Sequence, residues 1–76
     1  MDVLDKLHHL LPHWIEHNES HVATFREWSE RAEQGGAGAA AAALREAIRS
    51  VEAANEALRR AEQSLAADHE HHNHHG

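Results

Sequence analysis

Apolar residues recur every three or four positions along most of the chain, which is the spacing of an amphipathic α-helix. Two such stretches, at about residues 2–34 and 38–67, are separated by a glycine-rich turn that begins at Gly35. No stretch alternates between apolar and polar residues as a half-buried β-strand does. The pattern therefore predicts an all-α fold, an antiparallel two-helix hairpin that occupies residues 1–68.

The first helix contains the only proline of the chain, Pro12. A proline inside a helix removes one backbone hydrogen bond and kinks or breaks the helix. The apolar pattern keeps its phase across Pro12 and continues through Trp14. We therefore expect the first helix to be kinked or broken at Pro12, without a large change of direction.

Each helix carries a stripe of mostly apolar residues that we expect to face the other helix. In the first helix the stripe comprises Leu7, Leu11, Trp14, Asn18, His21, Phe25, Trp28 and Ala32. In the second it comprises Leu44, Ile48, Val51, Asn55, Leu58, Glu62 and Leu65, flanked by Ala40, Ala47, Ala54 and Ala61. The aromatic members are expected as core anchors. Because one hairpin cannot cover faces this wide, we expect a homodimer that forms a four-helix bundle.

Four polar residues interrupt these stripes: Asn18, His21, Asn55 and Glu62. Burying such a group without a hydrogen bond costs about 1–3 kcal/mol, so each is expected to have a partner. In an antiparallel hairpin Asn18 lies level with Asn55, and His21 lies within one turn of Asn55. One interpretation is therefore a metal-free helical oligomerisation or interaction module, whose buried Asn/His network sets register and oligomeric state.

Histidine is frequent and unevenly distributed. Ten of the 76 residues are histidine, and they form an N-terminal set, His8, His9, His13, His17 and His21, and a C-terminal set, His69, His71, His72, His74 and His75. His13, His17 and His21 follow one another at intervals of one helical turn, so their imidazoles can converge on one transition metal ion. Glu16 and Glu62, which lies within a turn of His9 and His13, are the candidate oxygen ligands. This is the second interpretation of the first helix.

Residues 69–76 are predicted to form a flexible His-rich tail. An expression tag has a similar composition, but Glu70 and Asn73 interrupt this run of histidines, which favours a native tail. Antiparallel helices bring both chain ends to the same pole, so the tail histidines are expected near His8 and His9. All these histidines are candidate ligands for nickel, cobalt or zinc, and nitrogen and oxygen ligands do not choose among the three.

Composition and charge argue against several classes of function. The formal charge is −6, and the seven Lys and Arg residues form no basic patch, so we expect no nucleic-acid partner. No apolar run approaches the ~20 residues that span a bilayer, and no signal peptide is visible, so we expect a cytoplasmic protein without membrane contact. The HExxH motif, a phosphate-binding glycine loop and inward-facing Glu-x-x-His pairs are missing, so we expect no enzyme. The predicted function is divalent transition-metal storage, buffering or delivery, with a metal-recipient protein as a further partner.

Two runs of sequence resemble a known group of proteins. Residues 13–28 (HWIEHNESHVATFREW) and 53–58 (AANEAL) resemble a family of short, uncharacterised bacterial and archaeal helical-hairpin proteins that carry an HWxEHNxxH run and a later ANE run. The matching positions are His13, Trp14, Glu16, His17, Asn18, His21, Asn55 and Glu56. The resemblance implies the hairpin fold and a site in the first helix. It implies no activity, and it does not include the tail.

Overall fold

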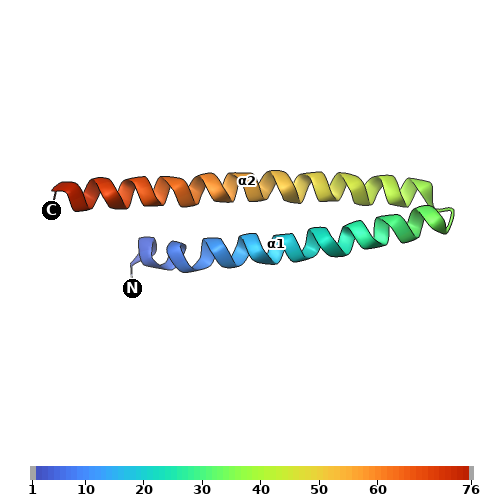
Figure 1. The fold of residues 1–76 in the computed structure, drawn as a ribbon, viewed down its shortest axis with the longest axis horizontal. Coiled ribbons are helices and arrows are strands. Elements are labelled where there is room, and N and C mark those ends of the chain that lie inside the picture. The colour runs from blue at the N-terminus through green and yellow to red at the C-terminus, as the bar shows by residue number, and fades with distance from the viewer. Residues whose placement is uncertain (1, 76) are drawn as a thin grey trace.

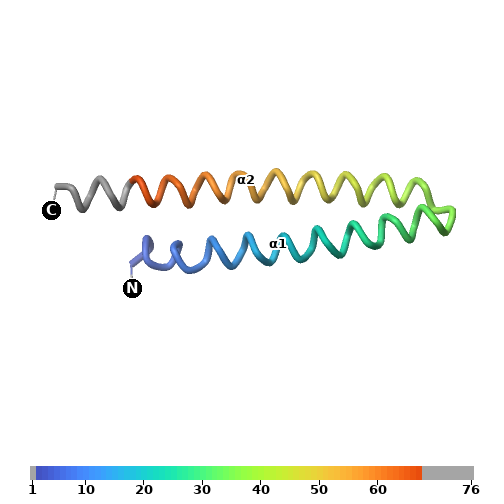
Figure 2. The backbone as a smooth tube through the Cα atoms, in the orientation of Figure 1, coloured from blue at the N-terminus to red at the C-terminus, as the bar shows by residue number. Residues whose placement is uncertain are grey.

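A computed structural model of the chain consists of two helices joined by a tight turn (Figure 1). Helix α1 spans Val3–Gln34 and helix α2 spans Gly38–His75. The structure describes the backbone of residues 2–75 and the side chains of residues 2–67, and this part contains no strand. The helices run antiparallel in a rod with Cα extents of 61 × 18 × 13 Å (Figure 2). The predicted all-α hairpin is thereby confirmed.

The predicted tail concerns side chains at the end of α2. Its candidate ligands are His69, His71, His72, His74 and His75, and all of them lie outside the residues whose side chains are described. The flexible tail over residues 69–76 and its metal ligands therefore stay predictions.

Helix α1 has a strong start and continues through its proline. The Asp2 carboxylate accepts a hydrogen bond of 2.9 Å from the Asp5 backbone N–H, which satisfies one of the free amides of the first turn. Pro12 lies inside the helix, and the helix is not broken there. Of the two forms that the sequence predicts at Pro12, the structure excludes the break.

The turn depends on one glycine. Gly36 has a φ of +83°, a backbone conformation that residues with a Cβ rarely adopt. This conformation lets the Ala37 N–H reach back to the Ala32 carbonyl at 2.8 Å, beside the bond of 2.9 Å from the Gly35 N–H to the Arg31 carbonyl. These bonds satisfy the last carbonyls of α1 and reverse the chain within a few residues.

The contact between the helices is narrow, and on α1 it lies to one side of the predicted stripe. The buried residues are Leu11, Ile15, Val22 and Ser29 on α1 and Ala41, Ile48, Asn55 and Leu65 on α2. Trp14 and Trp28, which the sequence predicts as core anchors, are 41% and 52% exposed, so that prediction is wrong for the isolated hairpin. Small and β-branched side chains allow the helices to approach closely, whereas an indole between them would force them apart.

One polar residue lies in the middle of this contact. Asn55 is 3% exposed, its Oδ1 accepts a hydrogen bond of 2.9 Å from Asn18 Nδ2, and its own Nδ2 donates to the Ile15 carbonyl at 3.2 Å. The amide thus bonds to α1 through both its oxygen and its nitrogen. The prediction that Asn18 and Asn55 lie level with each other is confirmed. His21 lies outside this network, since its ring nitrogen lies beside that of His17.

Replacing Asn55 with Ala should lower the free energy of unfolding by about 1–3 kcal/mol, because both hydrogen bonds that join the buried Asn55 amide to α1 are lost. Urea denaturation followed by circular dichroism measures this change. Gln63→Ala is the control, since it removes an exposed amide from the same helix, and it should change stability by less than about 0.5 kcal/mol. Equal effects of the two substitutions would contradict a structural role for Asn55.

Candidate functional site

The two edges of the hairpin differ in chemistry, and we name the first the ionic edge. It carries three ion pairs between the helices: Glu19–Arg59 at 2.9 Å, Arg26–Glu52 at 3.4 Å and Glu33–Arg45 at 3.8 Å. On each helix these residues are seven positions apart, so they form one line beside the helix contact. The ionic edge is thus a ladder of opposite charges along the hairpin.

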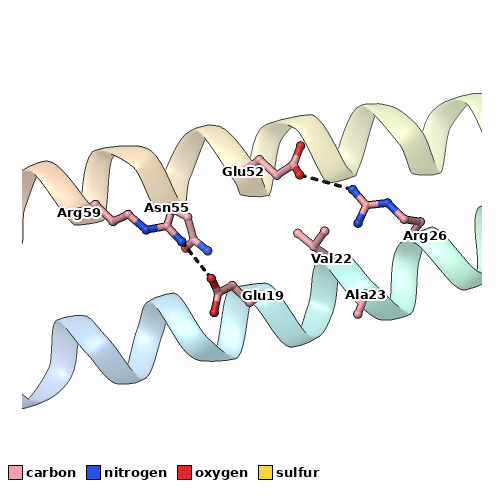
Figure 3. A pocket seen from close by; sticks show the side chains of 7 residues that line it. All are labelled: Glu19, Val22, Ala23, Arg26, Glu52, Asn55 and Arg59. Atoms are coloured by element: carbon pink, nitrogen blue, oxygen red, sulfur yellow. Dashed lines mark hydrogen bonds and ion pairs between the residues drawn. The ribbon is translucent and has the colours of Figure 1, made fainter.

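A groove lies on the ionic edge between the two helices (Figure 3). Its lining residues are Glu19, Val22, Ala23, Arg26, Glu52, Asn55 and Arg59. Figure 3 shows two of the ion pairs spanning the space between the helices on either side of Val22. Every charge in the groove is therefore half of an ion pair, and the Asn55 amide already has partners. Such exposed pairs contribute about 0–1 kcal/mol each, so this edge supports the fold and offers little to a ligand.

The opposite side of α1 carries a ladder of rings at intervals of four residues, formed by His13, His17, His21 and Phe25. The ring centroids are separated by 6.4, 4.5 and 5.6 Å along the series. Four residues of an α-helix advance by about 40° beyond one full turn. The ladder therefore crosses from the outer surface at His13 to the half-buried Phe25, and we name this side the histidine edge.

The centre of this ladder is a close pair of imidazoles. The Nε2 atoms of His17 and His21 are 3.0 Å apart, and both side chains are exposed. Without a metal ion this distance fits a hydrogen bond in which one ring carries the proton on Nε2 and the other accepts it. An ion that bonded to both nitrogens would displace this proton and would lie to one side of the line that joins them.

The same distance also fits chelation. Metal–imidazole bonds are about 2.0–2.1 Å long, so nitrogens 3.0 Å apart subtend roughly 90° at the ion. That angle belongs to neighbouring positions of octahedral or square-planar coordination, whereas tetrahedral coordination would separate the nitrogens by about 3.4 Å. Small side-chain rotations supply the difference. His17 and His21 are therefore spaced to bind one transition metal ion as a bidentate pair.

The other predicted ligands do not join this pair. His13 and Glu16 line a shallow hollow with His17 and Ser20, but the His13 ring stacks on His17 at a centroid distance of 6.4 Å instead of converging with it. His8 and His9 are exposed in the first turns of α1, and Glu62 is half-buried on α2. Within residues 2–67, no group of three His, Cys, Asp or Glu side chains surrounds one point. The described side chains thus bring only two candidate ligands together.

Apolar side chains lie on the same side of α1 as the pair, as the predicted stripe that contains Trp14, His21 and Trp28 implies, but they are exposed. Leu10, Trp14 and Trp28 are 39%, 41% and 52% exposed. The apolar pattern predicted both tryptophans between the helices of one hairpin. The spacing of seven residues from Trp14 to His21 and from His21 to Trp28 is the signal that links them, since residues at this spacing share one line on a helix.

Comparison with known proteins assigns the chain to a family whose description names no activity. The family model described as Domain of unknown function (DUF8180) matches residues 7–65, and the chain belongs to this family. The match includes the histidine pair and the contact between the helices. No curated protein and no solved structure matches the chain. In the part of the chain that the structure describes, neither helix has an apolar stretch long enough to cross a membrane.

Metal binding at this pair should weaken as the pH falls, because protons and metal ions compete for the same imidazole lone pairs. Lowering the pH from about 7.5 to about 5.5 should therefore reduce the affinity for Ni²⁺ at least tenfold. The measurement needs a full-length variant that carries Asn at positions 69, 71, 72, 74 and 75, called the tail-silent variant below. Equal affinity at both pH values would contradict histidine ligation.

Proposed function

We propose that this member of the DUF8180 family binds a divalent transition metal ion through His17 and His21, and that its role is metal storage, buffering or delivery. The observation that carries the proposal is the 3.0 Å separation of the two Nε2 atoms on one face of a continuous helix. Two imidazoles one helical turn apart are an efficient bidentate ligand, because one backbone segment holds both. A nonenzymatic, cytoplasmic role is part of the same proposal.

The arrangement of the two rings favours binding because little has to move. The His21 ring stacks on Phe25 at a centroid distance of 5.6 Å and an angle of 20°, while its edge meets the His17 ring at 87°. Side chains held in this way lose little rotamer freedom when they bind an ion. A pair that is ordered before the metal arrives binds more tightly than two freely rotating imidazoles.

The chemistry of the ligands limits the choice of metal. Imidazole nitrogens suit nickel, cobalt and zinc, and the chain has no cysteine that would favour a thiolate site. The separation of 3.0 Å supports nickel or cobalt in octahedral coordination, and zinc needs a small opening of the pair. A site with two protein ligands exchanges its metal readily, which suits buffering and delivery to a recipient protein. The tail histidines, as additional ligands, would collect ions near the chain ends.

A metal-free interaction module is the second candidate, and the half-buried Asn18–Asn55 bond favours it. A polar pair of this kind fixes the register of packed helices at some cost in stability. Such a module needs no ion. It should melt at the same temperature with a chelator as with a metal, whereas a metal-binding site gains stability as the ion concentration exceeds Kd.

Isothermal titration of Ni²⁺, Co²⁺ and Zn²⁺ into the tail-silent variant tests the proposal. Adding His17→Ala and His21→Ala should weaken binding at least about 100-fold, because both nitrogens of the chelating pair are lost. Adding His8→Ala and His9→Ala instead removes the same number of exposed imidazoles from the same helix and should change affinity less than about threefold. Circular dichroism of both variants confirms that the helices remain.

Two results would count against the proposal. If the tail-silent variant binds none of the three ions, metal affinity belongs to the tail alone and the interaction module becomes the better account. If the two double substitutions weaken binding equally, the affinity is spread over exposed histidines and the pair is not a site.

A further inference from the structure

The histidine pair is an incomplete site. Transition metal ions in proteins have four to six ligands, and within residues 2–67 no third His, Cys, Asp or Glu side chain converges on the pair. The remaining ligands come from water or from another protein group. The surface around the pair indicates which of these two sources supplies the remaining ligands.

One face of the hairpin is apolar on both helices. On α1 the line of residues next to the contact, on the side away from the ionic edge, is Trp14, His21 and Trp28. On α2 the corresponding line is Leu44, Val51 and Leu58, which are half-buried, and beyond it lie Ala40, Ala47, Ala54 and Ala61. Because the ion pairs occupy the other edge on both helices, these two lines share one face of the hairpin. We name it the apolar face.

The apolar face has the symmetry of a dimer interface. The Asn18–Asn55 bond fixes the register and brings His21 close to the level of Val51. Trp14 and Trp28 lie seven residues on either side of His21, and Leu44 and Leu58 lie seven residues on either side of Val51. A two-fold axis that runs across both helices at this level therefore places Trp14 of one copy opposite Trp28 of the second copy, and Trp28 opposite Trp14. It faces His21 with the second copy's His21.

Its size and charge also fit a second copy. A helix of 32 residues is about 48 Å long, and with the 18 Å width of the hairpin the face covers roughly 850 Å². A stable interface buries about 800 Å² on each partner. The two central lines contain no Asp, Glu, Lys or Arg, although the chain carries a formal charge of −6. The Arg31 guanidinium lies 4.7 Å from the centroid of the Trp28 ring, so a second copy that covers this indole also meets one cation. The alanines let a neighbouring helix approach closely.

We propose that a second copy of this chain covers the apolar face about this axis, and that His17 and His21 of both copies bind one metal ion between them. The metal part of this inference rests on the proposed function. In this dimer each α1 packs antiparallel on the other α1, the two turns lie at opposite ends, and the four helices form a bundle. Four imidazoles then complete a site that one hairpin leaves half-formed.

The stoichiometry of the tail-silent variant tests the shared site. Sedimentation equilibrium with a chelator present should give twice the mass of the chain, and titration with Ni²⁺ should give one tightly bound ion per two chains. One ion per chain, or a monomer in the presence of Ni²⁺, would overturn the shared site and leave the proposed function standing. A dimer that binds no ion would overturn both.

Paired substitutions test which face forms the dimer. Ala47→Gln with Ala54→Gln places two uncharged side chains on the apolar face and should shift the protein toward monomer and weaken Ni²⁺ binding at least tenfold. Ala42→Gln with Ala53→Gln makes the same change on the outer side of the same helix and should do neither. The proposal is wrong if both variants remain dimeric with unchanged Ni²⁺ affinity. Equal helical content of the two, from circular dichroism, excludes misfolding as the cause.

Discussion

The rest of the hairpin depends on the two hydrogen bonds of Asn55. Its amide lies in the contact between the helices and bonds to the Asn18 side chain and the Ile15 carbonyl. Sliding one helix along the other would leave the buried Asn55 amide without these partners, at a cost of about 1–3 kcal/mol. These two hydrogen bonds therefore select one register of α1 against α2 among several that the apolar residues alone would tolerate. The same register aligns the ion pairs of the ionic edge and sets His21 close to the level of Val51.

Around this contact, the two edges divide the polar chemistry of the chain. The ionic edge is closed within one hairpin, because each of its charges has a partner on the other helix. The histidine edge is open, since its imidazoles and two indoles face outward. A rigid helix holds the imidazoles of His17 and His21 together without help from the second helix. The candidate chemistry is thus local, while its surroundings depend on what covers that edge.

If a second copy supplies that cover, metal binding and dimerisation are linked. An ion that binds the dimer more tightly than the monomer stabilises the dimer by mass action, and dimer formation raises the affinity for the ion to the same extent. A protein of this kind holds its metal tightly as a dimer and releases it readily as a monomer with two ligands. Such a switch suits a buffering or delivery role, because dilution or a competing partner would free the ion.

The sequence by itself determined the features that depend on neighbouring residues. The two helices, the turn at Gly36 and the His17–His21 pair follow from glycine position and helical spacing, and the level of Asn18 and Asn55 follows from the turn. The side of α1 that meets α2 was decided only in the tertiary structure. Apolar residues cover so much of this helix that its pattern allows more than one contact, and packing selected Ile15 over the bulkier indoles. The directions of the other candidate ligands likewise depend on rotamers and helix rotation, which spacing along one chain does not encode.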